Sequence, residues 1–222
     1  SNMAGSADSW GGDNLSLGFT NNILDVAGVA SLNRAIPGDT CLNFIQFANH
    51  RIRGHEYCTN ILLALGTNDT LAGAFNTPEQ YIQVLDLLST LGKPITCLTV
   101  PPRSVTNSGG VQTPDTNVLT RRNMINKFIR SKGHPAINDV WDVSAIIEDP
   151  AKPGTYRAMN SAGELPVAGD MLHYTRAGVR WIIQNGAPMV NSAKSMVSLS
   201  QTPAIRYAEL EKAQARAYNP IV

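Results

Sequence analysis

The sequence has little of what marks nucleic-acid-binding and membrane proteins. Its 18 Lys and Arg residues are nearly balanced by 17 Asp and Glu, and charged residues make up only 16% of the 222 residues. A protein that binds nucleic acid or an anionic membrane surface shows an excess or a cluster of basic residues, so this balance argues against both. No apolar run approaches the roughly 18 residues that a membrane-spanning helix needs. We therefore expect no nucleic-acid partner and no membrane span.

Cysteine is also scarce. The three cysteines, Cys41, Cys58 and Cys97, form no CxxC pair and no Cys/His spacing typical of a zinc site. Their odd number excludes a framework made only of paired disulfides, whereas a single Cys41–Cys58 bridge stays open. We expect neither a metal nor an organic cofactor.

Apolar residues are present in sufficient number for one well-packed domain. Hydrophobic residues make up 43% of the sequence, an ordinary share for a globular protein. A chain of this length buries a stable core without disulfide bonds or metal ions. We expect one domain over residues 4–200, followed by a charged, helix-prone tail over residues 201–222 that is a candidate surface for oligomerisation. Ser1 and Asn2 before Met3 resemble the remnant of a cleaved tag, and no signal peptide is recognisable, so the compartment stays open.

Short apolar runs alternate with amphipathic stretches along the chain. Strands are expected over 29–35, 61–65, 94–100 and 140–143. Residues 61–65 are continuously apolar, which is typical of a strand covered on both faces. The expected helices carry apolar residues at helical spacing: one near 42–48, one with Thr77 as N-cap and Pro78 at its first position, one over 115–132, and one from 174 or 175. The polar stretch 149–169 is expected to be a loop. This alternation predicts a three-layer α/β/α sandwich with a mostly parallel, flavodoxin-like sheet.

Ligands of such sheets bind beyond the carboxyl ends of the strands, and polar residues occur at these positions. They are Ser9 in Ala-Asp-Ser, Gly38 in Asn-Arg-Ala-Ile-Pro-Gly-Asp-Thr, Asn68 in Gly-Thr-Asn-Asp, and Asp170 and His173 in Asp-Met-Leu-His. Taken singly, each has an ordinary structural role: helix cap, turn glycine, Asx-turn, carboxylate at a helix N-terminus, or hydrogen-bonded loop histidine. Their joint occurrence in this order favours a catalytic interpretation.

Taken together, the four blocks resemble those of the SGNH hydrolases, also called GDSL-type esterases and lipases. The resemblance spans about residues 7–185 and implies that Ser9 is the nucleophile, His173 its general base and Asp170 the residue that orients the imidazole. It also implies an oxyanion hole made of the Ser9 and Gly38 N–H groups and the Asn68 amide. Trp10, next to Ser9, is either a wall of the substrate pocket or a core residue.

The N-terminal block departs from the family pattern. Ala7 stands where the family usually has glycine, and only residues 3–6 precede the serine block where the family has its first strand. Three alternatives stay open: a minimal strand formed by residues 3–6, a strand that lies outside this sequence, or a substitute strand formed by residues 195–200.

The resemblance implies a serine esterase that hydrolyses carboxylic esters. Few aromatics (6%) and no visible apolar lid helix favour a small or polar substrate, such as an O-acetylated saccharide. Two alternatives from the same fold are a short-chain or lysophospholipid esterase or thioesterase, and a non-catalytic domain that binds carbohydrate or mediates assembly. A hydrolase using Cys41 or Cys97 has the weakest support, because no Gly-x-Cys-x-Gly or Gly-x-Ser-x-Gly elbow is present.

Overall fold

The structure, a computed structural model, describes most of the chain between residues 23 and 196. The described residues are 23–24, 26–29, 31, 34–36, 38–72, 78–106, 111–169, 171 and 173–196. Several predictions concern residues outside these ranges: Ser9, Trp10, Asp170, the segment 3–6 and the tail 201–222.

Three parallel strands form the central sheet of the described chain. They are β1 (Ile61–Leu63), β2 (Ile95–Leu98) and β5 (Ile137–Trp141), in the order β1-β2-β5. Ile95 of β2 aligns with Ile61 on one side and with Ile137 on the other. All four residues of β2 are buried, because helices cover both faces of the sheet, and this explains the continuous apolar runs.

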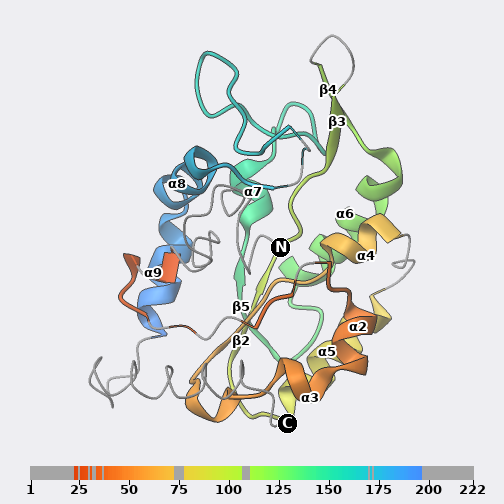
Figure 1. The fold of residues 1–222 in the computed structure, drawn as a ribbon, viewed down its shortest axis with the longest axis vertical. Helices are drawn as coiled ribbons and strands as arrows, with labels where there is room; N and C mark the ends of the chain where they lie inside the picture. Colours follow the sequence, from red (N-terminus) through yellow and green to blue (C-terminus); the bar gives the residue numbers. More distant parts are fainter. Residues whose placement is uncertain are drawn as a thin grey trace, which may run out of the picture.

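One face of the sheet is covered by α2 (Cys41–Gln46), α5 (Glu79–Ser89) and α6 (Thr116–Arg130) (Figure 1). Most of the apolar residues at helical spacing in α5 and α6 are buried here with Cys97 of β2, while Phe128 of α6 and Leu91, just after α5, are partly buried. The short helix α3 (Ala48–Arg51) and the 3-10 turn η2 (His55–Tyr57) follow α2. The buried set on this face is Cys41, Leu63, Tyr81, Val84, Leu85, Leu88, Ile95, Cys97, Val100, Ile125, Ile129 and Ile137.

The other face is covered by α7 (Val143–Ile147), α8 (Arg176–Asn185) and α9 (Ala187–Ser195). Leu98 of β2 and Trp141 of β5 point into this second core, together with Val179 and Ile182 of α8. Figure 1 shows the two helical layers on either side of the sheet. The predicted three-layer α/β/α architecture with a parallel sheet is therefore confirmed.

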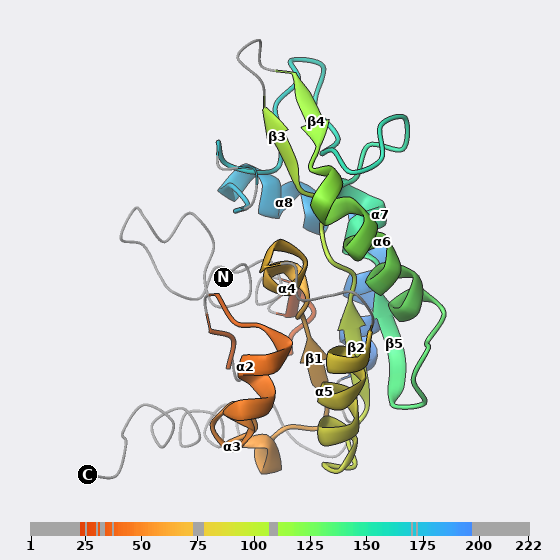
Figure 2. The same ribbon diagram turned by 90° about the vertical axis from the view of Figure 1, so that its right-hand side faces the viewer.

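Beyond the carboxyl ends of the strands lie the segments that the functional prediction concerns (Figure 2). The helix α4 (Thr67–Ala72) follows β1, and an antiparallel hairpin of β3 (Ser104–Thr106) and β4 (Gln112–Pro114) follows β2. After α7, the chain runs through the predicted loop 149–169, whose extended residues form only two isolated bridges.

Several predicted boundaries are wrong. The described residues of the segment 29–35 form no strand. The strand predicted at 140–143 begins earlier and ends at Trp141, because Asp142 caps α7 by accepting a hydrogen bond from the Ala145 N–H. Helix α5 starts at Glu79, so Pro78 occupies the N-cap rather than the first helical position, while Thr77 lies outside the described residues.

Two further expectations are corrected. Cys41, Cys58 and Cys97 are all free thiols, so the Cys41–Cys58 bridge is not formed. Ser195 is the last residue of α9, which contradicts a substitute strand beginning there; residues 197–200 lie outside the described chain.

Candidate functional site

Gly38 lies in a tight turn that leads into α2. The Asp39 N–H donates to the Ile36 carbonyl at 3.2 Å, which closes the turn. Gly38 has φ +78°, a left-handed conformation that glycine adopts without strain, and no atom of a non-adjacent described residue lies within 4 Å of the position of its missing Cβ. Thr40 then caps α2, because its hydroxyl oxygen accepts a hydrogen bond from the Asn43 N–H.

Asn68 belongs to α4 rather than to the loop that the Gly-Thr-Asn-Asp segment suggested. Gly66, with φ +113°, redirects the chain after β1, and α4 begins at Thr67. The Asn68 Nδ2 donates to the Asp39 carbonyl at 2.9 Å. The structure thus brings Asn68 against the residue that follows Gly38, although Asp39 and Asn68 are 29 positions apart in the chain.

Asp69, next to Asn68, is a completely buried carboxylate. Its Oδ1 accepts a hydrogen bond from the Cys41 N–H at 2.8 Å, at the start of α2. Its Oδ2 has no hydrogen-bond partner among the described residues. Burial raises the pKa of Asp69, because the charged form loses water, and the nearby Asp39 adds to this effect. Burial also raises the pKa of the Cys41 thiol, and the charge of Asp69 raises it further.

The side chain of Asp39 is held from a different direction. Arg51 of α3 donates to both carboxylate oxygens, from Nε at 2.8 Å and from Nη2 at 3.0 Å. The two side chains are only about a tenth exposed, at 11% and 9%. A bidentate pair of this kind fixes geometry as well as charge. The segment 38–41 is therefore held by three side chains: Asn68 and Asp69 bond to its backbone, and Arg51 bonds to the Asp39 carboxylate.

His173 lies in a turn that precedes α8. The Ala168 N–H donates to the His173 carbonyl at 2.7 Å, and the Thr175 N–H donates to the Pro166 carbonyl at 3.0 Å. Thr175 caps α8 by accepting a hydrogen bond from the Gly178 N–H. A Cβ on Gly178 would lie 1.9 Å from the Pro166 carbonyl oxygen, so only glycine allows α8 to approach this turn so closely.

Tyr156 forms a hydrogen bond with the backbone of the turn that carries His173. It is buried, and its hydroxyl donates to the Met171 carbonyl at 3.3 Å. Met171 has φ +55°, an uncommon conformation for a residue with a side chain. Gln112 of the hairpin holds Tyr156 in turn: its Oε1 accepts from the Tyr156 N–H, and its Nε2 donates to the Tyr156 carbonyl.

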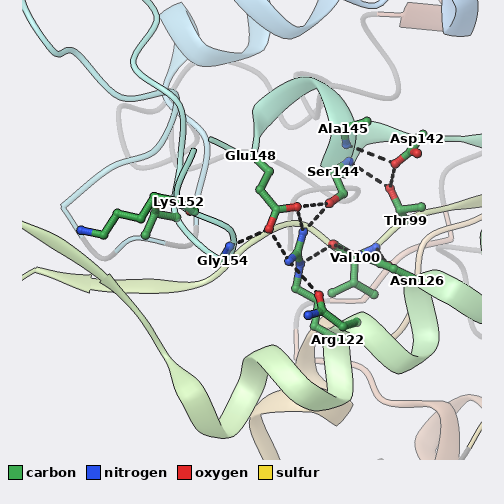
Figure 3. A network of polar contacts seen from close by, with 12 residues as sticks. Thr99, Val100, Arg122, Asn126, Asp142, Ser144, Ala145, Glu148, Lys152 and Gly154 are labelled. Carbon is green, nitrogen blue, oxygen red and sulfur yellow. Dashed lines mark hydrogen bonds and ion pairs between the residues drawn. The ribbon is translucent and has the colours of Figure 1, made fainter. Parts of the chain in front are cut away.

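A buried ion pair anchors the segment that leads to Tyr156 (Figure 3). Arg122 of α6, which is 1% exposed, donates to both oxygens of Glu148 at 2.8 and 2.6 Å and to the Val100 carbonyl at 3.0 Å. Glu148 also accepts from the Gly154 N–H at 2.6 Å. Burial alone would raise the pKa of Glu148, but the hydrogen bonds and charge of Arg122 outweigh it and lower the pKa.

Asp142 anchors the same region from the end of β5. Its carboxylate accepts from Thr99 at 3.0 Å (Figure 3). It also accepts from Arg130 at 2.7 and 2.8 Å. Burial opposes the charge of Asp142, yet the pKa is lowered because Arg130 and the Ala145 N–H stabilise the carboxylate. Asp142 is thus a structural cap and ion-pair partner.

Within the described part of the chain, no three His, Cys, Asp or Glu side chains come together as they would around a metal ion. A search of the same residues finds no helix with the length and apolarity to cross a membrane.

Sequence reasoning singled out Gly38, Asn68 and His173 but missed the residues that hold them. Asp69, Arg51, Tyr156 and Gly178 are the principal ones. A carboxylate directly after Asn68 was the only visible signal for Asp69, and nothing in the sequence marked Tyr156 or Gly178 as partners of the His173 turn.

The chain is similar to known proteins in its three-dimensional structure but not in its sequence. No family model and no curated protein sequence matches the chain. Among the solved structures that match is a protein from Desulfitobacterium hafniense DCB-2 assigned to the G-D-S-L family of lipolytic proteins. It has a TM-score of 0.55 and 9% identity, and the match covers 76% of this chain and 86% of the other. A carbohydrate esterase of family 3 from Talaromyces cellulolyticus matches more loosely, with a TM-score of 0.47, 15% identity, and coverage of 72% of this chain and 70% of the other.

Proposed function

Since the chain has the fold of the SGNH hydrolases, we propose that it is a serine esterase that hydrolyses carboxylic esters. Ser9 is the nucleophile, His173 the general base, and Asp170 the residue that orients the imidazole. The Ser9 and Gly38 N–H groups and the Asn68 amide form the oxyanion hole. Trp10 lines the substrate pocket.

The reaction follows from the chemistry of these groups. The Ser9 Oγ attacks the ester carbonyl carbon while His173 accepts its proton, because a neutral hydroxyl is a weak nucleophile at neutral pH. The carbonyl oxygen becomes an oxyanion that the three donors stabilise. Collapse of this intermediate breaks the ester C–O bond, and His173 returns the proton to the departing alcohol. Water then repeats the sequence on the acyl-enzyme and releases the carboxylic acid.

The observation that carries the proposal is the hydrogen bond from the Asn68 amide to the Asp39 carbonyl. It joins the second and third blocks beyond the carboxyl end of β1, where ligands of open α/β sheets bind. A side-chain amide has two N–H donors. The bond to Asp39 uses one and fixes the direction of the other, which the proposal assigns to the oxyanion beside Gly38.

For the substrate, we infer a small acyl group on a polar alcohol, such as an O-acetylated saccharide. The low aromatic content supports this inference. So does the hairpin β3–β4, which lies beyond β2 and joins its short strands to the polar loop 149–169 through Gln112 and Lys152. A long acyl chain would need an extensive apolar surface, and the described residues of the hairpin contribute only Val105 and Val111 as exposed large apolar residues.

The test is hydrolysis of p-nitrophenyl acetate by the wild type beside Ser9→Ala and His173→Ala. His134→Ala serves as the control for the histidine change, because His134 pairs with Asp86 of α5 and has no role in the proposal. We expect turnover by the wild type and by the His134 variant, and only the background rate from the other two.

Two results would contradict the proposal. If the wild type is as inactive as Ser9→Ala towards p-nitrophenyl acetate and acetylated xylan, the chain is a non-catalytic domain of this fold. If Ser9→Ala or His173→Ala keeps wild-type turnover, the catalytic residues lie elsewhere.

A further inference from the structure

Two consecutive side chains of α4 form hydrogen bonds with two backbone groups that follow Gly38 in the chain. Asn68 donates to the Asp39 carbonyl, one residue after Gly38, and Asp69 accepts from the Cys41 N–H, three residues after it. Because α4 directly follows β1, these bonds tie the Gly38 turn to the central sheet. We propose that Asp69 is a positioning residue for the oxyanion hole, which holds the Gly38 N–H in register with the Asn68 amide. This inference rests on the proposed function.

Among the described residues, no atom of a non-adjacent residue packs against the site of the missing Gly38 Cβ. The left-handed conformation of Gly38 is one of several that glycine adopts readily. Its position therefore depends on its neighbours. The Asn68 bond fixes the carbonyl of Asp39, the Arg51 pair fixes the side chain of Asp39, and Asp69 fixes the first N–H of α2.

The burial of Asp69 favours a functional role over a purely structural one. The residue is 0% exposed, and its Oδ2 has no hydrogen-bond partner among the described residues. Burying an incompletely satisfied carboxyl group opposes folding. Groups that are costly to bury are concentrated at functional sites.

Loss of the Asp69 acceptor should displace the Gly38 turn without unfolding the domain. Helix α2 remains packed through Cys41, Phe44 and Ile45 on the apolar core that it shares with α5. Its N-cap bond from Asn43 to Thr40 also remains. The expected defect is therefore in the transition state, where the oxyanion forms, and not in substrate binding.

The experiment compares Asp69→Asn, which keeps the acceptor, with Asp69→Leu, which has the same branched shape, is larger and has no acceptor. If Asp69→Leu does not fold, Asp69→Ala removes the same acceptor without adding bulk. Asn138→Ala is the matched control, because Asn138 Oδ1 accepts the Ile95 N–H at 2.8 Å at the amino end of β2, opposite to the site. The measurements are kcat and KM for p-nitrophenyl acetate, and the amide proton resonance of Cys41.

We expect Asp69→Leu to lower kcat about 10- to 100-fold and to leave KM within about 2-fold of wild type. This decrease in kcat is smaller than that caused by complete loss of an oxyanion donor. Asp69→Asn and Asn138→Ala should stay within about 3-fold of wild type. The Cys41 amide resonance should shift in the leucine variant and stay in place in the asparagine variant.

The inference is overturned if the wild type is active and Asp69→Leu matches its kcat. It is also overturned if Asp69→Asn loses as much kcat as Asp69→Leu, because the charge rather than the hydrogen bond would then matter. If the proposed function itself is wrong, the result is different: wild-type turnover would equal that of Ser9→Ala. The inference about Asp69 would then be overturned together with the proposed function.

Discussion

At the scale of single residues, the Gly38 turn depends on polar side chains that work in pairs. Asn68 and Asp69 bind the backbone of residues 39 and 41, while Arg51 binds the Asp39 carboxylate. Each bond joins segments that are distant in the chain, so the geometry of the candidate oxyanion hole is a property of the fold and not of one loop.

Asn68→Ala should lower kcat for p-nitrophenyl acetate by about 10²- to 10³-fold, the usual effect of removing one oxyanion donor. It also removes the bond to the Asp39 carbonyl. KM should change little, because the lost interaction forms with the oxyanion. The check is steady-state kinetics beside Asn117→Ala, whose backbone N–H, not its side chain, bonds to Asp115. An Asn68→Ala enzyme with wild-type kcat would contradict the assignment.

Asp69 should make stability depend on pH in a direction opposite to that of the ion-paired carboxylates. Burial raises its pKa, and Asp39, Cys41 and the buried Tyr81 face it. A carboxyl whose pKa is higher in the folded state stabilises the fold below its unfolded pKa, near 4, and loses that contribution as pH rises through the folded value.

The melting temperature of Asp69→Asn minus that of wild type should therefore increase as pH rises from about 4 upward. Thermal unfolding of both proteins across this range, read by circular dichroism, measures the difference. A difference that decreases over the same range would show that the Asp69 pKa is lowered in the fold.

Burial of a carboxylate cannot be predicted from the sequence, and this is why Asp69 was missed. In isolation, an aspartate in Gly-Thr-Asn-Asp has the composition of an exposed turn. Asn68 was recognised only because its block resembles a family motif.

At the scale of elements, the position of His173 depends on how closely α8 approaches the turn before it. Gly178→Ala would place a methyl group 1.9 Å from the Pro166 carbonyl oxygen, which is backbone and cannot rotate away. We expect a loss of about 1–3 kcal/mol of unfolding free energy and a lower kcat, because the turn that carries His173 must move.

Gly169→Ala is the control in the same turn, since no atom of a non-adjacent described residue lies within 4 Å of the added Cβ. Urea unfolding and p-nitrophenyl acetate kinetics measure both effects. Equal behaviour of the two alanine variants would show that the His173 turn does not depend on the Gly178 contact.

The Arg122–Glu148 pair should stabilise the segment 148–156 in a pH-dependent way. Removing one partner of a buried pair costs about 3–5 kcal/mol, because the other charge stays buried without its partner. The Glu148 side chain is 18% exposed, so we expect Glu148→Gln to lose unfolding free energy at or below the lower end of this range.

Arg122 lowers the pKa of Glu148 despite its burial, so this stabilisation is present above the unfolded pKa and is lost as pH falls through the folded value. Urea unfolding of wild type and Glu148→Gln at pH 7 and pH 4 should give a smaller difference at pH 4. A larger difference at pH 4 would contradict the ion-pair account.

Elements with strong local signals were predicted best. Helix α6 has Asp115 as its N-cap and an apolar inner face, and its observed bounds agree closely with the sequence pattern. Helix α4 was missed because its residues, Thr-Asn-Asp-Thr-Leu-Ala, lack an apolar period. The strands of the hairpin β3–β4 have three residues each, too few for an alternation to show.

At the scale of the whole molecule, alternation of strands and helices was sufficient to predict the three layers. Parallel strands covered on both faces leave continuous apolar runs in the sequence, and these mark β1 and β2. The contacts that place the site, such as Tyr156 with Met171 or Gly178 with Pro166, join loops whose mutual position follows only from the finished fold.

The central claim is that His173 activates Ser9 beside the candidate oxyanion hole of Gly38 and Asn68. A fluorophosphonate probe tests it most directly, because the probe forms a covalent bond only with a serine that a nearby base activates. The labelled residue is identified by peptide mass spectrometry in wild type, His173→Ala and His134→Ala. The account predicts label on Ser9 in wild type and His134→Ala and none in His173→Ala. Label on another residue, or equal labelling of Ser9 without His173, would contradict it.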